Sequence, residues 1–170
     1  MKSLKLWPHV ALALVILITG CTRDDICDPG EATTPLLIIT FKDFLNRDEA
    51  KQVVGLSVIG DYTPEVAILT SATTDSIAIP MRTTADNTQY QLIRAATDTS
   101  AEIIDVYLAA YAREDVYINR ACSYKTIFND VAFSENATDS DNDPATWILD
   151  VVINQTNVTD ENQSHITIYH

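Results

Sequence analysis

Three cysteines give the clearest chemical signal in the sequence, and the first of them is a candidate acyl acceptor. Cys21 follows Ile18-Thr19-Gly20, the pattern of a lipobox, in which a cysteine after a small residue receives lipid. The residues before it divide as a secretory signal does, with Lys2 and Lys5 ahead of an apolar run from Val10 to Ile18. We therefore predict cleavage after Gly20 and attachment of acyl chains such as palmitate to Cys21.

A membrane-spanning anchor is less favoured than this lipid anchor. The apolar run is shorter than the roughly 20 residues that a spanning helix needs, and polar residues follow it at once. The predicted organisation is a signal peptide at 1–20, a lipidated linker at 21–34 and a single domain at 35–170.

Cys27 and Cys122 remain as a pair in a chain that is expected to be exported, where disulfides persist. We predict that they are bonded, which would close a loop worth roughly 4–5 kcal/mol on the chain-entropy model. Two buried free thiols are the alternative. A catalytic thiol is less favoured, because only His165 and His170 would remain after cleavage to activate it.

Alternating carboxylates suggest one weak metal site. Asp139, Asp141 and Asp143 resemble the start of a calcium loop, and Asp150 occupies its twelfth position. Pro144, however, stands where such a loop requires glycine for its turn. We expect an acidic hairpin loop there, with calcium as a weak candidate and no other cofactor.

Catalysis has little support in the sequence. A nucleophile elbow, a paired-histidine zinc motif and a phosphate loop are all missing from the sequence. Asp105 with Glu114 or Asp115 is a conceivable pair for flanking a sugar bond, but solvated surface charge is the better interpretation. His165 and His170 are expected to be surface residues rather than ligands.

Two further features point to recognition or modification. Tyr107, Tyr111 and Tyr117 lie on a predicted hairpin, where they would form an exposed aromatic platform for a glycan or pack against a second sheet. Asp75-Ser76-Ile77 resembles an acceptor for O-glycosylation at Ser76, which also fits as an outward residue of a strand.

The elements that would position these residues are short strands. Apolar, β-branched and aromatic residues alternate with polar ones, and turn residues separate the runs. Eight or nine strands without a long helical pattern predict an all-β fold, an antiparallel immunoglobulin-like sandwich with a small barrel as the alternative. The expected strand faces are Leu37, Ile39 and Phe41; Val54, Leu56 and Val58; a short Val66–Leu69 run; Ile77, Ile79 and Met81; Tyr90 and Leu92; Trp147, Leu149, Val151 and Ile153; and Ile166 with Ile168.

Three local details accompany this pattern. Pro80 predicts that its strand lies at a sheet edge. The longest strand is expected to bury Ile104, Val106, Leu108 and Ala110 and to carry Asp105, Tyr107 and Tyr111 on its other face. It is expected to end in a turn at Arg113-Glu114-Asp115. A partner strand with Val116 and Ile118 should follow this turn. The stretch 42–50 is a candidate helical turn.

Charge narrows the possible partners. Cleavage would remove Lys2 and Lys5 and leave nine basic residues against 24 acidic ones, a formal charge of −15. This sign excludes ordinary nucleic-acid binding. It suits a solvated surface that keeps tethered molecules apart, with a basic partner as the lesser alternative.

Five segments of the sequence resemble segments found in one family of proteins. They are Asp24-Asp25-Ile26-Cys27, Thr34-Pro35-Leu36-Leu37-Ile38, Ile77-Ala78-Ile79-Pro80-Met81, Arg120-Ala121-Cys122-Ser123-Tyr124-Lys125-Thr126-Ile127-Phe128 and His165-Ile166-Thr167-Ile168-Tyr169. Together they resemble a family of small Bacteroidota lipoproteins that is known as a domain of unknown function. Ser123 stands where relatives usually have glycine. The resemblance implies an envelope location and a β domain, and it implies no reaction.

These observations favour a non-enzymatic lipoprotein of the bacterial outer membrane, acting as a binding or structural module for an envelope protein or glycan. A glycan-binding accessory lipoprotein is the alternative, and a hydrolase is the least favoured. Asp24 and Asp25 resemble acidic signals for export to the cell surface, whereas Arg23 weakens that match. The periplasmic and surface faces are therefore equally expected.

Overall fold

The computed structural model describes residues 26–31, 33–95, 102–135 and 146–170. The chain divides into a larger unit, Thr33–Val116 with Lys125–His170, and a smaller unit whose described residues are 26–31 and 117–124. The predictions for the signal peptide, Cys21 and the calcium candidates Asp139, Asp141 and Asp143 lie outside the described residues. Within the described part, no helix is long and apolar enough to cross a membrane.

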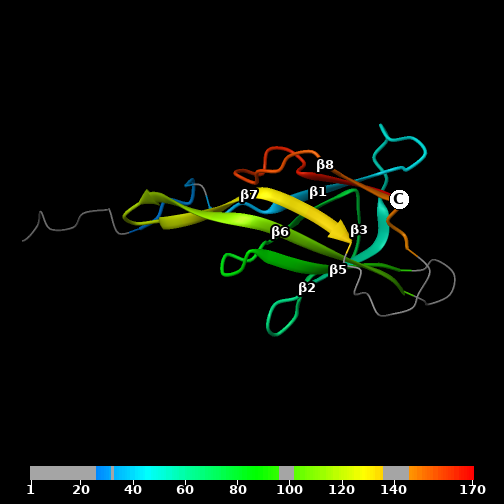
Figure 1. Ribbon diagram of the computed structural model, residues 1–170, viewed down its shortest axis with the longest axis horizontal. Helices are drawn as coiled ribbons and strands as arrows, with labels where there is room; N and C mark the ends of the chain where they lie inside the picture. Colours follow the sequence, from blue (N-terminus) through cyan, green and yellow to red (C-terminus); the bar gives the residue numbers. More distant parts are fainter. Residues whose placement is uncertain (1–25, 32, 96–101, 136–145) are drawn as a thin grey trace, which may run out of the picture. The chain divides into compact units, whose positions relative to one another are not determined.

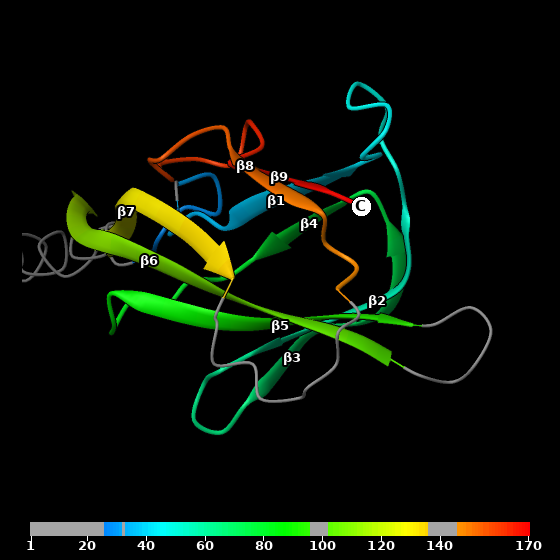
Figure 2. The same ribbon diagram turned by 45° about the vertical axis from the view of Figure 1, so that its right-hand side comes forward.

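The larger unit is a sandwich of two sheets, which Figures 1 and 2 show as two layers. One sheet has the strand order β4-β1-β9-β8 and the other β3-β2-β5-β6-β7. The predicted all-β sandwich is confirmed, and the sheets do not close into the alternative barrel. The strands are β1 (Leu37–Lys42), β2 (Val53–Gly60), β3 (Val66–Thr74), β4 (Ser76–Ile79), β5 (Asn87–Ala95), β6 (Glu102–Asn119), β7 (Ser123–Glu135), β8 (Asp150–Ile153) and β9 (Ile166–Tyr169).

Among the strand pairs whose register the structure describes, pairing is antiparallel except between β1 and β9, which run parallel with Ile39 opposite Ile166. Alternation within each strand cannot reveal this exception, because it depends on which distant segments meet. β4 lies at the edge of its sheet, as Pro80 predicted, and ends one residue before that proline.

The core lies between the two sheets and contains most of the predicted inward faces. Fully or almost fully buried are Leu37, Ile39, Phe41, Leu56, Val58, Ile77, Ile79, Met81, Tyr90, Leu92, Ile166 and Ile168. Alternation therefore identified the inner face wherever a strand is regular and packed on one side.

β2 departs from the predicted face because it contains a bulge. Val53 is buried and Val54 is 52% exposed, whereas the sequence predicted Val54 on the inner face. Gly55 has a φ of 66°, a left-handed conformation that glycine adopts without a steric penalty. The register with β3 shifts between Val53 and Leu56, so that both residues face the core.

β6 presents the opposite face from the predicted one. Asp105, Tyr107, Ala109 and Tyr111 are buried, while Ile104, Val106, Leu108 and Ala110 are only half-buried. The predicted turn at 113–115 is also wrong, because β6 continues to Asn119 and the chain turns at 120–122. The face of β6 that carries the large tyrosine rings is buried, and the Tyr111 hydroxyl finds hydrogen-bond partners inside the protein. The alternation of aliphatic residues on the other face does not determine which face is buried.

Two other local predictions need correction. Trp147 is buried before β8 begins, but Leu149 and Ile153 are exposed, so the predicted alternation does not extend through this strand. Trp147 Nε1 donates to the carbonyl oxygen of Leu92, which anchors the ring between the sheets. The stretch 42–50 forms bends and turns with a bridge between Lys42 and Ala50, and contains no helical turn.

The smaller unit contains the disulfide that the sequence predicted. Cys27 and Cys122 are bonded, with their Cα atoms 4.7 Å apart. The backbone N–H of Cys122 donates to Asn119 Oδ1, which stabilises the turn between β6 and β7. Ser123 has a φ of 64°, the left-handed conformation for which glycine is better suited, so the turn forms with serine at this position.

Candidate binding groove

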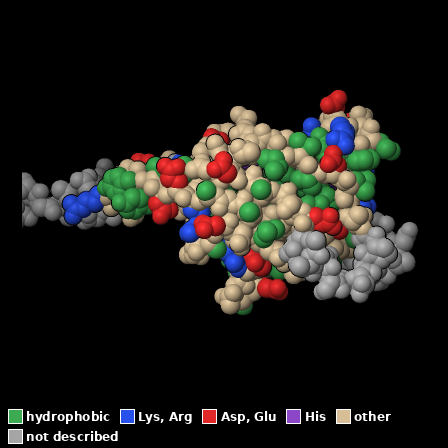
Figure 3. Space-filling model, in the orientation of Figure 1, with side chains coloured by type: hydrophobic (Ala, Val, Ile, Leu, Met, Phe, Trp, Pro, Cys, Tyr) green, Lys and Arg blue, Asp and Glu red, His purple; other side chains and the backbone are tan. Residues whose placement is uncertain are grey.

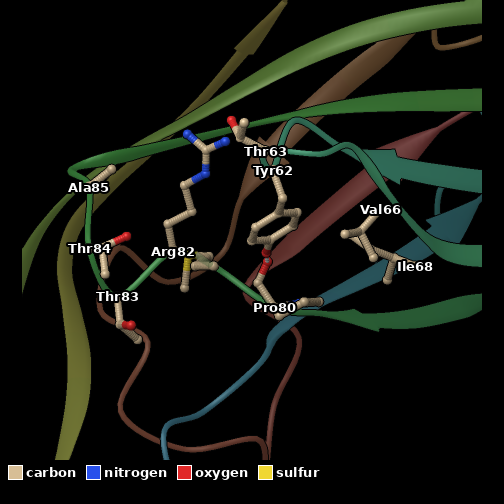
Figure 4. A pocket seen from close by; sticks show the side chains of 10 residues that line it. Tyr62, Thr63, Val66, Ile68, Pro80, Arg82, Thr83, Thr84 and Ala85 are labelled. Atoms are coloured by element: carbon tan, nitrogen blue, oxygen red, sulfur yellow. Dashed lines mark hydrogen bonds between the residues drawn. The ribbon is translucent and has the colours of Figure 1, made fainter.

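The main candidate site is a groove of about 620 Å³ in the larger unit, at one end of β3 and β4. Its walls come from the β2–β3 connection with the start of β3, and from the segment between β4 and β5 (Figure 4). It is lined by Tyr62, Thr63, Val66, Ile68, Pro80, Met81, Arg82, Thr83, Thr84 and Ala85. Pockets that combine apolar walls with a few polar groups are typical of binding sites.

The position of Tyr62 is fixed by contacts at both ends of its ring. A Cβ atom at Gly60 would lie 2.5 Å from Tyr62 Cε2, so only glycine lets the ring pack this closely. The hydroxyl donates to the carbonyl oxygen of Pro80 at 2.9 Å, and Figure 4 shows the ring pointing toward Pro80. Burial raises the pKa of Tyr62, which keeps this hydroxyl a neutral donor.

Arg82 supplies the positive charge of the groove. Its guanidinium lies 3.1 Å from Asp61 Oδ1 and 5.4 Å from the centre of the Tyr62 ring, beside which Figure 4 shows it. Its backbone N–H donates to Thr88 Oγ1, and its carbonyl oxygen accepts from the Tyr111 hydroxyl. The backbone at Arg82 is therefore held firmly, and its charge is partly balanced by Asp61.

A second cavity of about 280 Å³ continues along the open side of the sandwich and shares Ile68 with the groove. Its lining comes from β3 and β4, which are joined by Asp75 alone and belong to different sheets. β3 and β4 are also the edge strands of the two sheets on this side. The groove and this second cavity therefore lie next to each other at Ile68, and the larger of the two is the one that Tyr62 and Arg82 line.

The predicted carboxylate pair does not come together. Asp105 lies on the same continuous strand β6 as Glu114 and Asp115, nine and ten residues before them, or about 30 Å away at about 3.3 Å per residue. A glycosidase needs its two carboxyl groups within roughly 5–10 Å. Asp105 Oδ2 instead accepts hydrogen bonds from the Trp147 and Ile148 N–H groups and from Thr146 Oγ1.

Of the two predictions for the three tyrosines, packing in the core is confirmed for Tyr107 and Tyr111, and the exposed platform is wrong for them. Tyr107 is buried and stacks on Phe133 with ring centres 5.0 Å apart. Tyr111 is buried edge-on against Phe128, and its hydroxyl lies 2.6 Å from Thr88 Oγ1. Tyr117 is 57% exposed, but it belongs to the smaller unit, where it pairs with Tyr124.

Both histidines are buried, which corrects the expectation of surface residues. His165 Nδ1 accepts from the Ile38 N–H at 3.0 Å, so the ring is neutral there and helps to hold β1 beside β9. His170 packs edge-on against Phe41 and Trp147. Within the described residues, no group of histidine, cysteine and carboxylate side chains is placed to hold a metal.

We expect acidification to destabilise the fold through His165. Burial lowers the pKa of His165 below the usual 6.5, although the nearby Asp160 opposes this shift. The unfolded chain therefore takes up a proton first as the pH falls through 6.5, and stability is lost below that point and fully kept above it. Urea unfolding at about pH 7.5 and about pH 5.5 measures the loss. His165→Asn keeps an acceptor for Ile38 without titrating, so its loss should be smaller than that of the natural chain; equal losses would contradict the assignment.

Ser76 lies exposed at the start of edge strand β4. Its backbone N–H and carbonyl oxygen both bond to Thr74 Oγ1, which shapes the corner between β3 and β4. Its O-glycosylation stays a prediction.

Comparison with known proteins gives a family without an assigned role. A family model described as a family of unknown function (DUF6452) matches residues 55–170. No curated protein and no solved structure matches the chain.

Proposed function

We propose that this chain, which belongs to the DUF6452 family of unknown function, is a non-enzymatic lipoprotein of the bacterial outer membrane that binds an extended, mainly apolar segment of another envelope protein. The observation that carries the binding role is the groove between the β2–β3 connection and the β4–β5 segment. The family adds no reaction to this proposal, since its description assigns none.

The location rests on the residues around Cys21. The lipobox Ile18-Thr19-Gly20-Cys21 supports lipidation, and the short apolar run before it supports export with cleavage. The Cys27–Cys122 disulfide supports an oxidising compartment, where such bonds persist. Acyl chains on Cys21 would hold the protein at a membrane surface without embedding it.

A peptide is the ligand class that suits this groove best. Val66, Ile68 and Met81 offer apolar contacts in the groove, and a second cavity beside Ile68 lies between the edge strands β3 and β4. The hydroxyls of Thr83 and Thr84 line one end of it and can donate to peptide carbonyl oxygens. Extended peptides are commonly recognised beside sheet edges, where pockets take alternate side chains.

The test uses the lipidated protein in nanodiscs and a displayed library of random dodecapeptides, from which bound sequences are selected and titrated by calorimetry. We expect selected peptides to carry apolar residues at alternate positions. Val66→Arg places a charge in the groove at a residue that is 46% exposed, so the fold should tolerate it. It should weaken binding by about tenfold or more, a change of about 1.4 kcal/mol.

Leu45→Arg is the matched control, because Leu45 is 92% exposed and does not line the groove. It should leave the affinity unchanged. The proposal fails if the library yields no binder, or if both arginine variants affect the selected peptides equally.

A further inference from the structure

The smaller unit carries an exposed apolar surface, which we call the hairpin tip and define as Ile26, Tyr117 and Tyr124. Their side chains are 80%, 57% and 63% exposed. Figure 3 shows hydrophobic side chains gathered on the surface of this unit. Tyr117 and Tyr124 contact each other, and contiguous exposed apolar surface of this kind is typical of a contact site.

The two tyrosines are held as a pair. Their ring centres lie 5.2 Å apart with an interplanar angle of 65°. Tyr124 is two residues from Cys122, which the disulfide binds to Cys27, and Ile26 directly precedes Cys27. The disulfide therefore joins the exposed residues of two distant segments into one surface, which reduces the entropy lost when that surface binds.

The tip is also close along the chain to the proposed lipid anchor, so this argument rests on the proposed lipidation. Cys27 lies six positions after Cys21, which limits their Cα atoms to about 20 Å apart at about 3.5 Å per residue. A second contact so near the first one forms at high effective concentration and needs little intrinsic affinity.

The chemistry of the tip fits the polar boundary of a bilayer. Tyrosine is favoured there because its ring is apolar and its hydroxyl stays hydrated. Arg120 is exposed in the smaller unit, but Asp28 and Glu31 are exposed there too, so charge gives no net attraction to anionic lipid. Contact through the aromatic rings should therefore be independent of lipid charge.

We propose that the hairpin tip inserts into the headgroup boundary of the bilayer that holds the acyl chains of Cys21. The acyl chains and the two tyrosine rings then attach the protein to the bilayer at two points. The disulfide connects the segment that carries the lipid to the segment that carries the rings.

A tryptophan at the tip tests this directly. Trp147 is the only tryptophan that remains after cleavage of residues 1–20, and it is 3% exposed, so it gives a constant background. Tyr124→Trp and, separately, Tyr117→Trp are reconstituted as lipidated protein into phosphatidylcholine vesicles whose acyl chains are brominated near the headgroup. We expect the added emission to shift to shorter wavelength and to be quenched, relative to unbrominated vesicles, with no change when anionic lipid is included.

Leu45→Trp is the control, because Leu45 is exposed outside the tip. Intact mass of the same samples reports the anchor independently. Acylated protein without quenching at either tip position, or with equal quenching at position 45, would overturn the tip contact and leave the anchor standing. Protein without acyl chains would overturn both proposals.

Discussion

Replacing Cys27 and Cys122 with serine should lower the free energy of unfolding by about 4 kcal/mol. The bond joins residues 95 positions apart, so it removes many conformations from the unfolded chain. Urea unfolding followed by Trp147 fluorescence measures the change.

The natural chain under reducing conditions is the matched control, because it loses the bond without losing the sulfur atoms. It should unfold at the same urea concentration as the double serine variant. A loss below about 1 kcal/mol would show that the unfolded chain is not restricted by this crosslink.

The disulfide was predictable because the expected compartment and the number of cysteines suggest it without any knowledge of three-dimensional contacts. Once Cys21 is assigned to lipid, only one pairing remains for an exported chain. The face of β1 was predictable for a similarly simple reason. β1 is short and regular, and buried residues alternate with half-buried ones along it, so alternate apolar residues mark the core.

β2 and β6 show where alternation fails. In β2 the bulge at Gly55 turns Val53 toward the core and Val54 toward solvent, the reverse of the alternation expected for the strand. A glycine within a strand is the one sequence signal for such a bulge. In β6 both faces carry apolar residues. Tyr111 is buried because Thr88 and the Arg82 carbonyl oxygen lie where its hydroxyl needs partners, and neither is near it in the sequence.

The groove could not be predicted from the sequence for the same physical reason. Tyr62 and Pro80 are eighteen residues apart, and they meet because the segment after β4 lies beside the β2–β3 connection in the folded chain. The one local trace is Gly60, two residues before Tyr62, where a side chain would collide with the ring. A glycine at the end of a strand is also compatible with an ordinary turn, so this trace does not specify a site.

Asp105→Ala should destabilise the fold by about 3 kcal/mol, because the Asp105 carboxylate has a structural role in the core. Asp105 is 5% exposed, and its Oδ2 atom accepts from the N–H groups of Trp147 and Ile148 and from Thr146 Oγ1. Removing the carboxylate leaves the buried N–H groups of Trp147 and Ile148 without this acceptor. An unsatisfied buried donor costs about 1–3 kcal/mol. Urea unfolding of the purified variant measures the loss.

Asp105→Asn separates hydrogen bonding from charge. Its side-chain oxygen can still accept from Trp147 and Ile148, so we expect a loss of only about 1 kcal/mol, the difference between a charged and a neutral acceptor. Equal losses for the two variants would mean that the negative charge itself holds Trp147 in the core. An alanine variant as stable as the natural chain would contradict the bonding scheme, and would remove the reason why an acidic residue faces inward on β6.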